Sequence, residues 1–191
     1  MKTYTIIGGV NGVGKSSFTG VLVRKTDDLG IIIDTDKLNA EFDGDRIQGG
    51  KKAIALMEDC LEKGLSFTQE TTLSGVRTLK TIRRAIELDY HIRLYYIGVN
   101  SCEESLLRIA NRVRKGGHDI PSEDVQRRYE KRFSDLSAVL PYCSEAEFWD
   151  NENGFVNVGE YKNGSLVIYG NEPPQWLTEL KKLIFMSFRT R

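Results

Sequence analysis

A glycine-rich segment near the N-terminus has the residue types and spacing of a phosphate-binding loop. It matches the pattern G-x-x-x-x-G-K-[ST] at every fixed position. Glycines let successive backbone N–H groups turn toward an anion, and the following helix adds its positive N-terminal end. Lys15 can reach the β- and γ-phosphates of ATP or GTP, and the Ser16 hydroxyl can bind Mg²⁺. The predicted nucleotide-binding residues are Gly9, Val10, Asn11, Gly12, Val13, Gly14, Lys15, Ser16 and Ser17.

Acidic side chains follow two of the predicted strands. Asp34 and Asp36 come directly after the apolar run 31–33, and Glu70 follows the run 65–69. The carboxyl ends of parallel strands face one crevice, so we expect these acids beside the phosphate-binding loop. Asp36 is the candidate base for an attacking hydroxyl, and Glu70 the candidate contact to substrate or to Mg²⁺-bound water. Each aspartate could instead cap the turn after its strand, and both interpretations stay open.

An arginine-rich segment has the parts of a mobile lid. Arg112 lies on a predicted helix that ends at Gly116-Gly117, and Arg127 and Arg128 lie on the next helix. Small P-loop kinases close such lids over the transferring phosphate and exclude water. The alternative for any single arginine is a solvated helix face. His118, at the break, is equally consistent with a hinge hydrogen bond and with a phosphate contact.

The order of apolar patterns predicts an α/β fold. We expect a P-loop NTPase-type three-layer sandwich with a mostly parallel sheet, helices on both faces and a helical lid. The second strand is predicted to be fully buried, and the helix over 76–88 to turn Leu79, Ile82 and Ile86 inward. Asn163-Gly164 predicts a hairpin. Strands are expected at 3–7, 31–33, 65–69, 92–99, 146–149, 155–161 and 165–169, and helices at 15–25, 51–63, 76–88, 101–115, from 121, and after Pro173-Pro174.

Length and composition predict one domain over 1–191, with a lid at about 101–143 and a C-terminal hairpin and helix at about 154–189. Lysine plus arginine and aspartate plus glutamate each total 27, and this balance argues against nucleic acid as a partner. The scattered cysteines and the lack of a long apolar run predict a cytoplasmic protein with free thiols and no membrane partner.

Taken together, these motifs resemble those of the zeta-toxin-like P-loop kinases, in particular their compact branch. The resemblance covers about 4–151 and includes the segments 33–36, 70–75, 112–121 and 127–129. It implies phosphorylation of a hydroxyl on a small-molecule acceptor by ATP or GTP. For the toxin members that acceptor is UDP-N-acetylglucosamine, at the sugar 3′-hydroxyl. An antitoxin protein acting in trans is also implied.

The resemblance assigns roles to individual residues. Lys15 would hold phosphates, Asp36 would be the base, Glu70 and Thr72 would contact the substrate, and Arg112 would face the phosphates. The family's second lid arginine corresponds best to His118, with Arg127 and Arg128 nearby as substitutes. The toxins' glutamate on an earlier helix has no clear match here. One alternative is a nucleotide-switched binding protein, although the absence of the N-K-x-D guanine-reading motif counts against its GTPase form. The other alternative is a polynucleotide kinase.

Overall fold

Seven strands form one sheet in the order β2-β3-β1-β4-β5-β6-β7. The structure is a computed structural model that describes residues 1–189. Strands β2, β3, β1, β4 and β5 run parallel, and β6 and β7 extend the sheet as an antiparallel hairpin. The strands are β1 (Thr3–Gly8), β2 (Ile31–Asp34), β3 (Phe67–Thr71), β4 (His91–Gly98), β5 (Glu145–Asp150), β6 (Val156–Lys162) and β7 (Ser165–Ile168).

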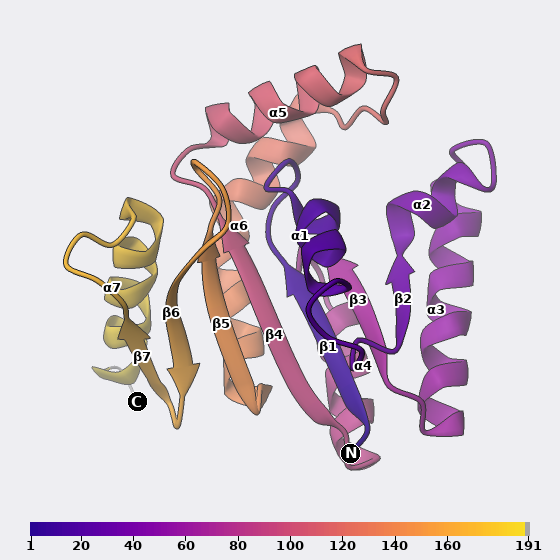
Figure 1. Ribbon diagram of the computed structural model, residues 1–191, viewed down its shortest axis with the longest axis horizontal. Coiled ribbons are helices and arrows are strands. Elements are labelled where there is room, and N and C mark those ends of the chain that lie inside the picture. The colour runs from indigo at the N-terminus through magenta and orange to yellow at the C-terminus, as the bar shows by residue number, and fades with distance from the viewer. Residues whose placement is uncertain (190–191) are drawn as a thin grey trace.

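Helices cover both faces of this sheet, as the sequence predicted (Figure 1). On one face, Phe18 and Leu22 of α1 pack against Ile7 and Ile97. On the other, apolar side chains of α3, α4, α6 and α7 share one larger core with the strands. The helices are α1 (Lys15–Leu22), α2 (Thr35–Ala40), α3 (Arg46–Lys63), α4 (Arg77–Glu87), α5 (Cys102–Arg114), α6 (Ser122–Val139) and α7 (Gln175–Arg189), with a 3₁₀ turn at Leu140–Tyr142.

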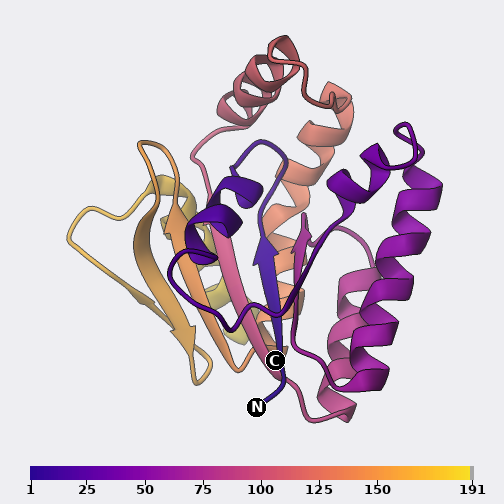
Figure 2. The same ribbon diagram turned by 45° about the vertical axis from the view of Figure 1, so that its right-hand side comes forward.

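The strand register brings the acidic strand ends together. Asp34 of β2 is the partner of Glu70 in β3, and β3 pairs in turn with β1, which leads into the phosphate-binding loop. Because all three strands are parallel, their carboxyl ends lie at one edge of the sheet. Helix α5 and the start of α6 rise above that edge (Figures 1 and 2), joined by a small apolar cluster around Ile109, Ile120 and Val125.

Two burial predictions are wrong. The second strand is not fully buried, because β2 is the outermost strand and leaves Ile31 and Ile32 exposed while Ile33 is buried. Helix α4 turns Ile82 inward, but Ile86 is 42% exposed. The sequence also missed the short helix α2, which begins where the second strand ends. Among the described helices, none has both the length and the apolar character needed to cross a bilayer.

Candidate active site

The phosphate-binding loop has the backbone that its glycines require. Gly9, Gly12 and Gly14 have φ values of 144°, 82° and 93°, a region that side chains with a Cβ rarely enter. A Cβ on Gly9 would lie 2.4 Å from the Ile97 carbonyl oxygen, and one on Gly12 would lie 2.5 Å from the Ser105 carbonyl oxygen. The loop is therefore pressed between the end of β4 and helix α5.

Lys15 folds back onto the loop. Its Nζ donates to the carbonyl oxygens of Gly9 and Val10 at 2.9 and 3.0 Å. Burial lowers the pKa of Lys15 to about 8, while the carboxylates of Glu70, Asp36 and Asp34 act in the opposite direction. The ammonium group of Lys15 is thus hydrogen-bonded to two backbone carbonyl oxygens instead of water. It remains close to the place where phosphates would sit.

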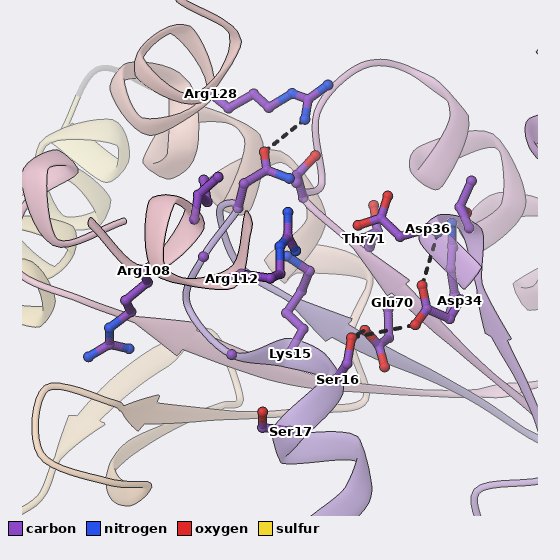
Figure 3. A pocket seen from close by; sticks show the side chains of 17 residues that line it. Lys15, Ser16, Ser17, Asp34, Asp36, Glu70, Thr71, Arg108, Arg112 and Arg128 are labelled. Carbon is purple, nitrogen blue, oxygen red and sulfur yellow. Dashed lines mark hydrogen bonds between the residues drawn. The ribbon is translucent and has the colours of Figure 1, made fainter. Parts of the chain in front are cut away.

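Glu70 links β3 to helix α1. Its Oε2 accepts a hydrogen bond from the Ser16 hydroxyl at 2.7 Å, and its Oε1 accepts one from Thr19 at 2.6 Å. Burial raises the pKa of Glu70, and the two hydroxyl hydrogen bonds act in the opposite direction. The Ser16 hydroxyl also lies 3.4 Å from Oδ2 of Asp34. One hydroxyl and two carboxylates therefore form an oxygen-rich corner beside the loop (Figure 3).

The two aspartates after β2 differ in their surroundings. Asp34 is buried, and its Oδ1 accepts hydrogen bonds from the backbone N–H groups of Asp36 and Lys37, so it is the N-cap of α2. Asp36 is exposed in the first turn of the same helix and lines the cavity. Its carboxylate accepts no hydrogen bond from any residue that the structure describes. Because Asp34 serves as the N-cap, Asp36 is the aspartate whose carboxylate is available to a ligand.

Arg112 of α5 points into the cavity from above (Figure 3). Its Nε and Nη2 atoms are buried and have no hydrogen-bond partner among the described residues. Leaving buried donors unpaired costs about 1–3 kcal/mol each, so this arrangement is suited to an anion that would pair with them. The lack of a side chain at Gly117 leaves room for this orientation of Arg112, because a Cβ there would lie 2.5 Å from Cγ of Arg112.

Two further arginines reach the cavity with partners of their own. Arg128 of α6 donates from Nη1 to Oδ1 of Asn11 in the loop, at 2.7 Å. Arg108 of α5 forms an ion pair with Glu104 at 2.6 Å and also donates to the carbonyl oxygen of Asn151 at 2.5 Å. The lid helices are therefore already fastened to the loop and to the end of β5.

One cavity of about 350 Å³ gathers most of the predicted site residues. Thr72 lines it, with its hydroxyl donating to Ser74 at 3.1 Å. Gly9, Val10 and Val13 shape the loop from behind. The structure does not bring His118 or Arg127 into the cavity: both are exposed, and Arg127 pairs with Asp124. The predicted residues that line it are Asn11, Gly12, Gly14, Lys15, Ser16, Ser17, Asp36, Glu70, Thr72, Arg112 and Arg128.

The predicted site residues do not include four that line the cavity, namely Thr35, Gln69, Thr71 and Ile109, and Arg108 was predicted only as part of the arginine-rich segment. Gln69 and Thr71 flank Glu70 at the end of β3, and the same strand-end rule that selected Glu70 applies to both. Arg108 lies one helical turn before Arg112, and this spacing places it on the same face of α5.

No family model matches the chain. An uncharacterized protein of Haemophilus influenzae (strain Rd) is 34% identical over 126 residues, which are 63% of this chain and 88% of that protein. The chain belongs to the same family as this Haemophilus protein.

Two solved structures have a similar fold. A chain from the PezAT chromosomal toxin–antitoxin system of Streptococcus pneumoniae matches 100% of this chain and 87% of its own length, with a TM-score of 0.67 and 16% identity. The AvrRxo1-ORF1:-ORF2 complex with ATP contains a chain that matches 95% of this one and 64% of its own length, with a TM-score of 0.66 and 16% identity. The chain therefore has the P-loop kinase-like fold that the resemblance implied.

Proposed function

We propose that this protein transfers the γ-phosphate of ATP or GTP to a hydroxyl of a sugar or nucleotide-sugar, such as UDP-N-acetylglucosamine. The observation that carries the proposal is the content of the cavity. It holds the phosphate-binding lysine, Lys15, a free carboxylate, Asp36, and the lid arginines Arg112 and Arg128. These are the groups that phosphoryl transfer needs, since its catalysis is mostly positioning and electrostatic stabilisation.

The residues present fit a magnesium nucleotide. The unpaired nitrogens of Arg112 suit a phosphate oxygen, and the glycine backbone at Gly12 leaves no room for a side chain in the loop. Ser16, Asp34 and Glu70 offer the hard oxygen donors that Mg²⁺ prefers. When bound, Mg²⁺ would neutralise charge on the phosphates.

Three side chains of this protein would then have separate roles in the transfer. Asp36, whose carboxylate carries no hydrogen bond within the described chain, would accept the proton of the attacking hydroxyl. Lys15 would exchange two carbonyl oxygens for phosphate oxygens, and Arg112 would pair its buried nitrogens with the same phosphates. The lid helices over the strand ends would exclude water from the reacting groups (Figure 2).

The acceptor side of the cavity is polar. Gln69, Thr71 and Thr72 line the cavity at the end of β3. Amide and hydroxyl groups can donate and accept hydrogen bonds, and this property suits a ligand that carries several hydroxyls. A sugar hydroxyl is therefore the acceptor that the lining favours. His118 and Arg127 remain proposed substrate contacts that would require the turn between α5 and α6 to move.

The deciding experiment is mass spectrometry of reaction products. The protein is incubated with Mg·ATP or Mg·GTP and separate panels of UDP-sugars, free sugars, nucleotides and oligonucleotides. We expect a mass gain of one phosphate on a sugar or UDP-sugar, and no gain with the Lys15→Ala variant. A gain confined to oligonucleotides would replace the proposal with a polynucleotide kinase. Tight nucleotide binding with no acceptor in any panel would support a nucleotide-switched binding protein.

We also propose an antitoxin protein as a partner in trans. The support is the fold shared with a chain of a toxin–antitoxin system. We expect expression of the wild-type chain to arrest growth. Expression of the Asp36→Asn variant at the same level should leave growth normal. Equal growth of both strains would remove the toxin assignment and leave the kinase proposal in place.

A further inference from the structure

The segment that follows β5 lies directly against the phosphate-binding loop. The side-chain Nδ2 of Asn151 donates a hydrogen bond of 2.8 Å to the carbonyl oxygen of Val13, 138 residues earlier in the chain. A Cβ on Gly14 would lie 2.7 Å from the same Nδ2 atom and 3.4 Å from the ring of Phe155. The loop and this segment are therefore packed as closely as a glycine allows.

This contact bears on the direction of one N–H group in the loop. The Val13 carbonyl and the Gly14 N–H belong to the same planar, trans peptide group, so they point in opposite directions. With the carbonyl held by Asn151, the Gly14 N–H is turned toward the other side, and it donates to no described residue. Gly14 lines the cavity and has a φ of 93°, so its flanking peptides have the rotational freedom that only glycine provides. Rotation of this peptide would present a carbonyl oxygen to the phosphates instead.

Asn151 is itself held on both sides. Its backbone N–H donates to the Gly98 carbonyl oxygen at 3.1 Å, at the end of β4. Its carbonyl oxygen accepts from Arg108, which is also paired with Glu104 on helix α5. The side chain is therefore presented to the loop from a support that includes the sheet and the first lid helix.

We infer that Asn151 is a positioning residue for phosphate binding: it holds the peptide between Val13 and Gly14 so that the Gly14 N–H faces the nucleotide phosphates. The inference rests on the proposed function only in taking the loop as a nucleotide site. It assigns Asn151 no contact with substrate, and its action passes through the loop backbone.

The test compares Asn151→Asp and Asn151→Ala with the wild type. The aspartate keeps the size of the side chain but replaces the donor with a charged acceptor beside a carbonyl oxygen, and the alanine removes the whole amide group without adding a charge. Asn153→Asp is the matched control, because Asn153 is an exposed asparagine in the same segment that forms no hydrogen bond with a described residue. Unfolding midpoints are measured for every variant, and Asn151→Ala decides the test if the aspartate does not fold.

Two probes are titrated against each variant: Mg·ATP and magnesium with inorganic tripolyphosphate, which carries the phosphates alone. We expect Asn151→Ala to weaken both probes about tenfold, Asn151→Asp more strongly, and Asn153→Asp neither. Unchanged affinity in both Asn151 variants would overturn the inference, and so would a loss for Mg·ATP without a loss for tripolyphosphate. A wild type that binds Mg·ATP but phosphorylates no acceptor would overturn the kinase proposal and leave this inference standing.

Discussion

Arg128 on the second lid helix is hydrogen-bonded to Asn11 in the phosphate-binding loop, although the two residues are 117 positions apart. The bond runs from Nη1 to Oδ1 at 2.7 Å, and both side chains line the cavity. The loop therefore holds a guanidinium near the place where charge would develop in the proposed phosphoryl transfer. Arg127, its neighbour on α6, points elsewhere and pairs with Asp124.

The bond to Asn11 singles out Arg128 as the arginine of α6 that would act on the transferring phosphate. Arg128→Gln should lower the rate of phosphotransfer about 10³-fold, because it removes a positive charge that stabilises the transition state. Mg·ATP affinity should change much less. Lys131→Gln, at an exposed position of the same helix, is the matched control and should retain most of the activity in a single-turnover assay. Equal losses in the two variants would mean that the side chain bonded to Asn11 is not the one that acts on the phosphate.

Asp36 should affect chemistry and not nucleotide binding. Asp36→Asn keeps the shape of the side chain but removes the proton acceptor, so we expect phosphotransfer to fall about 10²–10⁴-fold. Titration calorimetry should give an unchanged Mg·ATP affinity. Glu41→Gln, an exposed acid at the end of the same helix, serves as the control. Wild-type turnover by Asp36→Asn would exclude Asp36 as the base.

Arg112 should lower the stability of the protein without ligand and strengthen the binding of Mg·ATP. Arg112→Met removes the two buried nitrogens that lack partners, so the free energy of unfolding without ligand should rise by about 1 kcal/mol. The same change should weaken Mg·ATP binding at least tenfold. Thermal unfolding with and without Mg·ATP measures both effects. Arg114→Met, on an exposed position of the same helix, should change neither. A ligand-free midpoint that falls on Arg112→Met would show that the guanidinium is satisfied in solution.

Nucleotide binding should depend on pH through Lys15. Burial lowers its pKa from the ordinary value of 10.5 to about 8, so the charged form is lost as pH rises through about 8. Phosphates favour the charged form, and Mg·ATP affinity should therefore decline from pH 7 to pH 9, with proton uptake on binding near pH 8. Calorimetry in buffers of different ionisation enthalpy measures that uptake.

Lys15 should also contribute to pH-dependent stability without ligand. Between about pH 8 and 10.5 the unfolded chain binds more protons at this residue than the folded chain does, so the lysine's contribution to the free energy of unfolding rises with pH. Lys15→Met should remove this contribution. A wild type and a Lys15→Met variant with the same pH dependence would contradict the lowered pKa.

The predictable part of the molecule is the part encoded by short stretches of sequence. The phosphate-binding motif, the acids at the strand ends and the hairpin at Asn163-Gly164 each depend on residues close in the chain, and the structure places them as expected. The run Ile31–Ile33 has the composition of a central strand, but whether a strand is central or outermost depends on pairing with distant strands. Its exposure could not be predicted for that reason.

The sequence also could not show which of two similar, neighbouring side chains has which role. Asp34 and Asp36 have the same type and almost the same position, and only the helix start after β2 decides which one is the cap. Arg127 and Arg128 are adjacent on one helix, and only its rotation relative to the loop decides which one reaches Asn11. Asn151 showed no local signal, because its partner, Val13, lies near the other end of the chain.

The long-range bond between Asn151 and Val13 has a consequence for the synthesis of the protein. The phosphate-binding motif leaves the ribosome before Asn151, because the side chain that would orient one of its peptides is made 138 residues later. Since domains fold as units, a nascent chain that stops before Asn151 would display the motif with that peptide unrestrained. Nucleotide binding should therefore appear only after Asn151 has been made, and shorter nascent chains should bind nucleotide weakly.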